Sequence, residues 1–153
     1  MVSQDLETAL GYDHSVVQNI LDHHLQAGKP SVKAICLLLP RSMTTLSAPR
    51  NEEVDANAAA GLMLSQATGL RDLTYAFDLG DVQEIMVSGS FGKSLVRSED
   101  GYKVMVVLHQ QGALGLARFI ATNVIWEVDR TAHTFNHSSF HRWREPFSLT
   151  PPG

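Results

Sequence analysis

The sequence predicts an α+β domain built on a five-stranded, mostly antiparallel sheet with strand order 2-1-5-4-3 and helices on both faces. Residues 32–39 and 104–108 are apolar on both faces, so both strands are covered on both sides and lie centrally in the sheet. Residues 82–109 alternate strand-like runs with turn residues, which is typical of an antiparallel meander. Helical periodicity precedes the first strand and follows the last.

Length and charge limit the class of protein. The chain has 153 residues, about one domain, which we divide into a loose N-terminus (1–12), a folded domain (13–130) and a C-terminal extension (131–153). The net charge is −4 and the 12 Lys and Arg residues are scattered, which argues against nucleic acid as a partner. The acidic start and the lack of a long apolar run predict neither a signal peptide nor direct membrane insertion, so we expect a cytoplasmic protein.

The first helix is predicted to begin near Ser15, which forms a capping box with Gln18. Gly28 and Pro30 end it. Apolar residues at helical spacing give it one core face: Val16, Val17, Ile20, Leu21 and Leu25.

Two strands follow, joined by a turn at residues 40–42. The first, residues 32–39, contains Cys36, the only cysteine of the chain. A single cysteine excludes an internal disulfide, and its apolar neighbours indicate a buried, unreactive thiol. Residues 43–48 form a shorter and more polar strand, as expected at the edge of a sheet.

A long helix is expected from a cap at Asn51 to about Phe77. Gly69 lowers its helix propensity by about 1 kcal/mol. The meander follows, with its first hairpin turning at Phe91 and Gly92 and its second at the Asp100-Gly101 pair, whose residues favour positive φ. A last helix then presents a core face of Leu116, Ile120, Val124 and Val128.

This order of elements, over about residues 14–128, resembles the Roadblock family, the dynein light-chain type of domain. The resemblance lies in EEVDANAAAGLMLSQATGLRDL at 52–73 and in VQEIMV, EDGYKVMVVL and GALGLARFI between residues 82 and 120. It implies a homodimer, or a heterodimer with a paralogue, in which the long helices lie side by side and the sheets join edge to edge. It also implies a binding function, since bacterial and archaeal members often regulate or scaffold small Ras-like GTPases and others serve motors or membrane signalling complexes.

The chain departs from the family pattern in two places. Its second strand follows Pro40-Arg41-Ser42 instead of an Asp-x-x-Gly turn. It also carries an extension of about twenty residues after the last helix, which we expect to hold what is particular to this protein.

The small residues that open the long helix have two interpretations. They allow the helix to pack closely on its own sheet, or they allow the helix of a second subunit to approach. With the resemblance we favour the second interpretation and assign Ala58 and Ala59 to a dimer interface, continued on the same helical face by Leu62 and Gln66.

The strand at 82–88 is the other predicted part of the dimer interface. In the predicted order it forms an outer edge, and its apolar residues Ile85, Met86 and Val87 are a liability unless another chain pairs with them. We therefore add Glu84, Met86 and Ser88 to the predicted dimer interface.

The last helix carries a second stripe on a side distinct from its core face: Phe119, Asn123, Trp126 and Arg130. Leaving its aromatic side chains in water costs roughly 2 kcal/mol each. The extension offers aromatic residues to cover them, namely Phe135, Phe140, Trp143 and Phe147, with Arg142 and Arg144 beside Trp143 in a composition typical of binding hot spots. The alternatives are that the extension folds back on its own subunit, that a neighbouring subunit packs there, or that another protein docks.

Two motifs with possible chemistry have plainer explanations. GSFGKS at 89–94 looks like a phosphate loop, but the required first glycine is replaced by Val87 and the segment after Lys93 is strand-like, so a hairpin turn explains it better. His133, His137 and His141 would line one face of a helix and could bind a metal ion there, whereas in an extended tail they are simply solvated. We expect neither a metal nor a cofactor.

The functional prediction is a non-enzymatic, dimeric adaptor that scaffolds or regulates a small Ras-like GTPase or a signalling or motor complex. No catalytic triad can be assembled from the sequence. The alternative is a small-molecule sensor domain, which needs a polar cluster among its core positions. The predicted core residues Ile35, Leu37, Met105 and Val107 show no such cluster.

Overall fold

The computed structural model describes residues 11–41, 44–49 and 56–135, apart from the side chains of 56–57, 59–60 and 133–135. Its five strands form one antiparallel sheet in the predicted order β2-β1-β5-β4-β3. The strands are β1 (Val32–Leu38), β2 (Thr45–Ala48), β3 (Glu84–Ser88), β4 (Gly92–Glu99) and β5 (Tyr102–His109). The helices are α2 (His14–Gly28), α3 (Ala56–Ala76) and α4 (Leu114–Phe135). None of these helices is long and apolar enough to cross a membrane.

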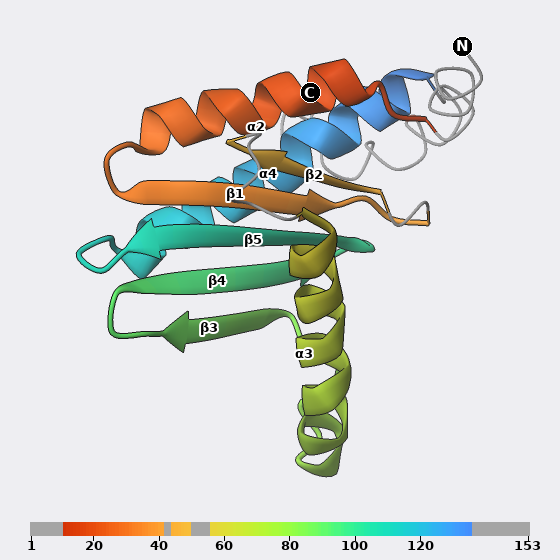
Figure 1. Cartoon of the computed structure of the whole chain (residues 1–153). Helices are drawn as coiled ribbons and strands as arrows, with labels where there is room; N and C mark the ends of the chain where they lie inside the picture. Colours follow the sequence, from red (N-terminus) through yellow and green to blue (C-terminus); the bar gives the residue numbers. More distant parts are fainter. Residues whose placement is uncertain (1–10, 42–43, 50–55, 136–153) are drawn as a thin grey trace, which may run out of the picture.

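One face of the sheet, the first face, is covered by two helices. α2 packs on β1 and β2, while α4 packs on β4 and β5 and also touches α2 (Figure 1). Alternate residues of each strand point to this face. The core between the layers is fully buried and includes Val17, Leu21, Ile35, Leu37, Leu95, Val104, Val106, Leu108, Val124 and Val128.

A polar chain crosses this core near the end of α4. The Tyr12 and Tyr102 hydroxyls lie 2.8 Å apart, and the Tyr102 hydroxyl donates to Asp129 Oδ1 at 2.9 Å. Both tyrosines are buried, and burial is the main cause that raises the pKa of each phenol. These hydrogen bonds connect the segment before α2 to β5 and α4.

The first helix begins earlier than predicted. Asp13, not Ser15, is the N-cap, because its Oδ1 accepts from the backbone N–H groups of Ser15 at 3.0 Å and Val16 at 3.4 Å. The predicted capping box is therefore wrong. Gln18 is buried instead, and its side-chain amide donates to the Ser47 carbonyl at 2.8 Å.

The second turn of the meander is as predicted, whereas in the first hairpin Gly92, predicted to be in the turn, already belongs to β4. Asp100 and Gly101 have φ values of 53° and 87°, the left-handed conformations of a two-residue hairpin turn. The first hairpin turns between Ser88 and Gly92 and exposes Phe91 at its tip. β4 starts two residues before the strand-like run SLVRS.

The long helix α3 runs through Gly69 without interruption. It ends at Ala76, one residue before the predicted Phe77, and Asp78 then takes a positive φ of 58°. The predicted cap, Asn51, lies outside the described residues. α4 is longer than its predicted core face, because residues 131–135, assigned above to the extension, continue it to Phe135.

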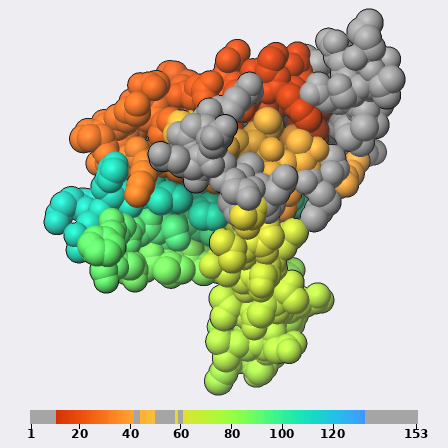
Figure 2. Space-filling view, viewed as in Figure 1, coloured from red at the N-terminus to blue at the C-terminus, as the bar shows by residue number. Residues whose placement is uncertain are grey.

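The other face of the sheet, the second face, is covered only in part. Met63 of α3 packs there with Cys36, Leu38 and Val96 in a small separate cluster. The rest of α3 runs past β3 and stands away from the body of the domain (Figures 1 and 2). Unlike α2 and α4, most of α3 does not lie over the sheet (Figure 1).

Candidate functional site

The projecting part of α3 presents apolar side chains to solvent. The exposed fraction is 53% for Leu73 and 69% for Phe77, just beyond the helix end. Leu62, Gln66 and Leu73 are four and seven residues apart, so they form one line along the helix. This α3 stripe contains two of the predicted interface residues and extends them toward the tip of the helix. Ala58 is exposed at its start, and the side chain of Ala59 lies outside the described set.

The outer edge of the sheet is β3, as predicted. In the described part of the chain β3 pairs only with β4, so its other side offers backbone donors and acceptors. Met86 and Val87 are exposed on opposite faces of this edge, and Ile85 is partly buried against the second-face cluster. Strand β3 is thus an apolar edge able to pair with another strand.

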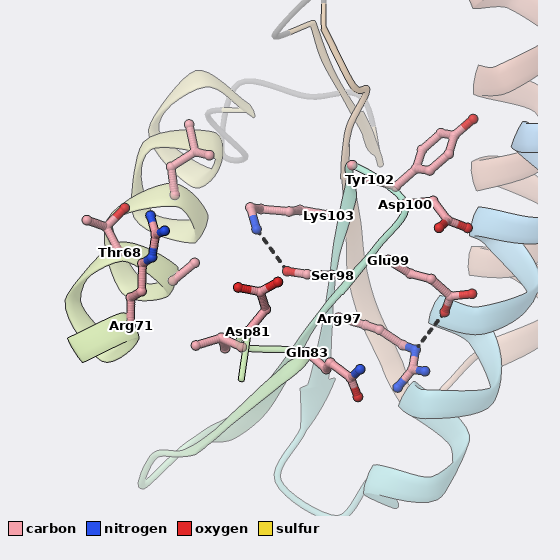
Figure 3. Close-up of a pocket in the computed structure, with 14 residues that line it drawn as sticks. Thr68, Arg71, Asp81, Gln83, Arg97, Ser98, Glu99, Asp100, Tyr102 and Lys103 are labelled. Atoms are coloured by element: carbon pink, nitrogen blue, oxygen red, sulfur yellow. Dashed lines mark hydrogen bonds and ion pairs between the residues drawn. The ribbon is translucent and has the colours of Figure 1, made fainter. Parts of the chain in front are cut away.

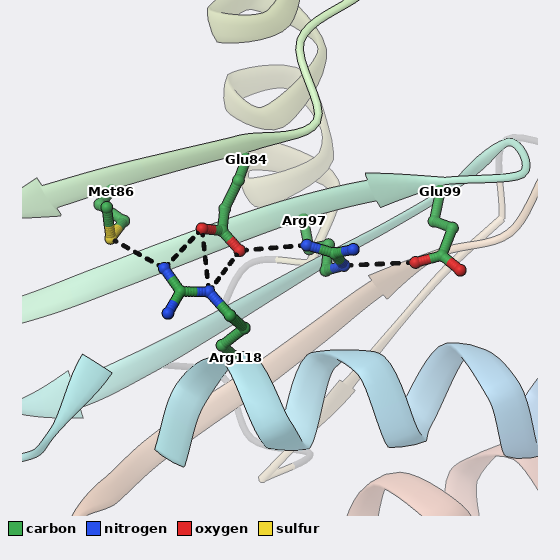
Figure 4. Close-up of polar contacts among 5 residues, drawn as sticks. All are labelled: Glu84, Met86, Arg97, Glu99 and Arg118. Atoms are coloured by element: carbon green, nitrogen blue, oxygen red, sulfur yellow. Dashed lines mark hydrogen bonds and ion pairs between the residues drawn. The ribbon is translucent and has the colours of Figure 1, made fainter. Parts of the chain in front are cut away.

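The carboxylate of Glu84 is held by two arginine side chains of the same chain. Arg118 of α4 donates to it through Nε, at 3.0 and 3.1 Å, and through Nη2, at 2.7 Å (Figure 4). Arg97 Nη1 donates to the same carboxylate at 3.2 Å and bridges to Glu99. These hydrogen bonds, led by that of Arg118, lower the pKa of Glu84. The network fixes β3 to α4.

The predicted interface residues fall on opposite faces of the sheet. Glu84, Met86 and Ser88 alternate with Ile85 and Val87, and the contact with Arg118 places the first group on the α4 side. The α3 stripe lies on the other side. A single helix–helix contact therefore does not contain both the α3 stripe and the predicted interface residues of β3. Pairing along the β3 backbone can still join these two sets in one interface.

A cavity of about 660 Å³ lies between α3 and the ends of β4 and β5 (Figure 3). Its wall on α3 includes Thr68 and Arg71, and its wall on the sheet includes Ser98 and Lys103. The Lys103 ammonium donates to Ser98 Oγ at 2.9 Å, and burial lowers the pKa of this lysine. A cluster of polar side chains therefore lines a cavity on the second face, but these side chains are exposed or half-buried and do not occupy core positions.

Sequence reasoning missed this cluster because the apolar pattern of β5 was considered without Lys103. Lys103 and Met105 are two residues apart, so strand alternation places both on the second face. That signal was available. The contact of Arg118 with Glu84 had no local signal, because the two residues are separated by 34 positions.

The α4 stripe is also exposed. The exposed fraction is 65% for Phe119 and 45% for Trp126, and the Arg130 guanidinium lies 4.6 Å from the centroid of the Trp126 ring. The Asn123 side-chain amide donates to the Phe119 carbonyl at 2.8 Å. Phe119, Trp126 and Arg130 thus share one side of α4, as predicted. Trp143 lies outside the described residues.

GSFGKS is a hairpin in the structure. Gly89 N–H donates to the Gly92 carbonyl at 2.7 Å, which closes the turn. A Cβ on Gly92 would lie 2.7 Å from the Leu108 carbonyl oxygen, so close strand pairing requires glycine there. The Lys93 ammonium donates to the Gly112 carbonyl at 3.1 Å and anchors the hairpin beside the start of α4.

The predicted histidine set is only partly described. His133 belongs to the last turn of α4, whereas His137 and His141 lie outside the described residues. Among described side chains, no group of three potential ligands lies close enough to hold a metal ion. His24 instead contacts Glu127 of α4, with 2.9 Å between Nε2 and Oε2.

Comparison with known proteins identifies the fold. No model of a known protein family matches the sequence, and no curated protein matches it. Solved structures do match. MglB of Myxococcus xanthus has a TM-score of 0.67 at 13% identity, over 80% of this chain and 92% of MglB.

Two further structures agree with this result. A Roadblock/LC7 domain from Streptomyces avermitilis has a TM-score of 0.64 at 16% identity, over 74% of this chain and 94% of that domain. An MglB in a tetrameric arrangement has the same TM-score and identity, over 82% of this chain and 92% of that protein. The chain therefore has a Roadblock-like domain fold.

Proposed function

We propose that the chain is a non-enzymatic adaptor that works as a dimer in the cytoplasm and regulates or scaffolds a small Ras-like GTPase. The observation that carries the proposal is the α3 stripe. The helix leaves its own sheet, and among the described residues Leu62 and Leu73 of the stripe are exposed, as is Phe77 just beyond the helix end. Exposed apolar side chains that lie together are typical of a site for protein–protein interaction.

The geometry of the edge and the helix favours a second copy as the missing part. If two β3 edges pair antiparallel, a twofold axis perpendicular to the sheet relates the subunits, and both second faces stay on the same side. Each α3 projects past β3, so it then extends over the second face of the other subunit. There Val87 is exposed and Met105 and Val107 are half-buried, which gives α3 an apolar floor.

The GTPase part of the proposal rests on the fold. The Roadblock resemblance implies small GTPases as partners, and two of the similar structures are MglB proteins, one of them in a tetrameric arrangement. With no catalytic group proposed in this chain, its contribution would be to position the partner's own residues and nucleotide.

The dimer is tested by the molar mass in solution, measured by light scattering over a dilution series. The wild-type chain is expected at twice its monomer mass of 16.8 kDa at micromolar concentration. Leu73→Asp buries a charge in the proposed interface and is expected to give the monomer. Thr68→Asp, at an exposed position that lines the cavity and lies outside the α3 stripe, is the matched control and should stay dimeric.

A wild-type chain that is monomeric at micromolar concentration contradicts the dimer. So does a Leu73→Asp variant that keeps the mass of the wild type. If the Leu73→Asp variant and the Thr68→Asp variant dissociate equally, the interface lies elsewhere on α3.

The GTPase is tested separately, by affinity purification from the native cell followed by mass spectrometry. A Ras-like GTPase recovered in this way is then purified, and its GTP hydrolysis and nucleotide release are measured with and without the adaptor. A change in either rate supports regulation, and binding without a change supports scaffolding. If no GTPase is recovered in either nucleotide state, the GTPase part of the proposal is contradicted. The proposed dimer is not affected by that result.

The cavity beside Lys103 favours a second candidate function, a small-molecule sensor. Lys103 and Arg71 would favour an anionic ligand, while Asp81, Glu99 and Asp100 would limit its size and charge. Native mass spectrometry of the protein purified from its own cell tests this candidate. A bound mass that is lost in Lys103→Met but kept in Lys33→Met, on an exposed position of β1, would support it.

A further inference from the structure

We propose that the α4 stripe is a docking site for the C-terminal segment of the same subunit, residues 136–147, which runs back along α4. The stripe consists of Phe119, Asn123, Trp126 and Arg130 on the side of α4 that faces away from the sheet. This inference does not depend on the proposed dimer or on the proposed GTPase.

The first argument is the chemistry of the stripe. Two large aromatic side chains occupy one side of a surface helix, with Phe119 more than half exposed. Burying an aromatic side chain of this size is worth roughly 2 kcal/mol, so a chemically matched segment nearby gains by covering it. The Arg130 guanidinium over the Trp126 ring adds a planar surface on which a further aromatic ring can stack.

The second argument is where the chain goes next. α4 ends at Phe135, on the same helix as the stripe, and 18 residues follow. At 1.5 Å per residue, Trp126 and Phe119 lie about 14 and 24 Å back along the helix from Phe135. At about 3.3 Å per residue, an extended segment takes Phe140 about 17 Å and Trp143 about 26 Å from Phe135. These are full contour lengths, so both aromatic residues reach the stripe only if the segment reverses tightly and directly after Phe135.

The third argument is the spacing between the aromatic residues. Phe119 and Trp126 are seven helical residues apart, about 10.5 Å. Phe140 and Trp143 are three residues apart, which is about 9 Å in a polyproline II conformation, and its three residues per turn place both side chains on the same side. The two pairs thus match in spacing when the segment runs antiparallel to α4, with Phe140 at Trp126 and Trp143 at Phe119.

Charge is also complementary. Arg142 and Arg144 flank Trp143 in the sequence, and Glu127 and Asp129 of α4 flank the stripe. Glu127 is about one third exposed at its contact with His24, so a second cation can approach it. A surface pair of this kind contributes about 0.2 to 1 kcal/mol and sets orientation more than affinity.

The two tryptophans of the chain make the site measurable. In Trp143→Phe, Trp126 is the only indole and an aromatic ring remains at position 143. A second variant, Phe140→Ser with Trp143→Ser, keeps Trp126 as the only indole and removes both proposed contacts. The proposal expects a red-shifted Trp126 emission and stronger acrylamide quenching in the second variant. Trp143→Phe with Ser148→Ala is the matched control and should behave like Trp143→Phe alone.

Identical emission and quenching in the two variants overturn the proposal. The variants change only residues outside the described domain, and circular dichroism checks that the helices are unaffected. A loss of helix in the second variant alone would mean that the segment is needed for folding, and the cysteine pair described next then decides whether it docks on α4.

A cysteine pair tests which subunit supplies the segment. Thr122→Cys lies on the exposed side of α4 between Phe119 and Trp126, and Arg142→Cys lies between the two proposed anchors. The proposal expects an intrachain disulfide after mild oxidation, seen by mass spectrometry under non-reducing conditions. Asn19→Cys with Arg142→Cys, which uses an exposed position of α2, is the control and should not form this bond. A disulfide between subunits, or none at all, overturns docking on the same subunit.

Discussion

The two faces of the sheet differ in how completely one chain covers them. On the first face, α2 and α4 bury Leu37, Val104 and Val106 without remaining exposure. On the second face, α3 buries only a small cluster around Met63 and then leaves the sheet. The difference indicates that the first face provides most of the stability of the single chain. The second face is the one that the proposed dimer would cover.

The largest expected effect tests the first face. Leu37→Ala removes a fully buried side chain and should lower the free energy of unfolding by about 2 to 5 kcal/mol, because the surrounding core cannot collapse fully. Met105→Ala, on the half-buried second face, should cost distinctly less at protein concentrations where the chain is a monomer. Urea denaturation measures both. Equal losses would break the comparison between the faces.

Tyr102→Phe is expected to have the next largest effect. It removes the hydroxyl that links Tyr12 to Asp129 and leaves buried polar groups without this partner, at a cost of about 1 to 3 kcal/mol. Thermal or urea unfolding measures the change. Tyr75→Phe, an exposed tyrosine of α3 bonded to Asp81, is the control on the other face and should change stability by less than about 0.5 kcal/mol.

A smaller effect on stability is expected from pH, at the contact between Glu84 of β3 and Arg118 of α4. The pKa of Glu84 is lowered in the folded chain, mainly by the hydrogen bonds from Arg118, so its contribution to stability is present at neutral pH. This contribution is lost as the pH falls below the ordinary value of 4.5 and through the lowered pKa. Glu84→Gln should therefore flatten the acid limb of the stability curve, measured by urea unfolding.

Two results would count against this assignment. An acid limb as steep in Glu84→Gln as in the wild type would show that other carboxyl groups dominate. An equal change in Glu99→Gln, whose carboxylate only bridges to Arg97, would show that the contact with Arg118 is not special.

The smallest effect is expected at Cys36, whose labelling reports on the second face. Burial raises the pKa of this thiol to about 11, so very little thiolate forms near pH 8. Iodoacetamide should leave the native protein unmodified and should react only as the chain unfolds. Labelling that instead rises on dilution, with the first face still folded, would show that α3 leaves the second face when the subunits separate.

The sequence was sufficient to predict the sheet order because its signals are local and strong. The apolar segments that became β1 and β5 had to be central, and the Asp100-Gly101 turn fixed the meander. The edge position of β3 follows from these two facts. The exposed aromatic stripe of α4 was likewise visible from helical spacing alone.

What could not be predicted depends on distant residues. Gln18 looked like a capping residue, but its amide bonds to Ser47, 29 positions away. Residues 131–135 were assigned to the extension, but they continue α4, where the Thr131 hydroxyl donates to the Val128 carbonyl at 2.7 Å. Periodicity showed which side of α3 is apolar, whereas the length of sheet beneath the helix is a property of the assembled fold.

The projection of α3 has a consequence for the lifetime of the chain in a cell. A helix with so few tertiary contacts opens locally at a low free-energy cost, and its exposed Leu, Tyr and Phe side chains are attractive to proteases. Degradation of such a segment depends on the population of the open form. If the proposed dimer forms, chains without a partner would then be degraded first, and turnover would match the amount of the protein to the amount that is assembled.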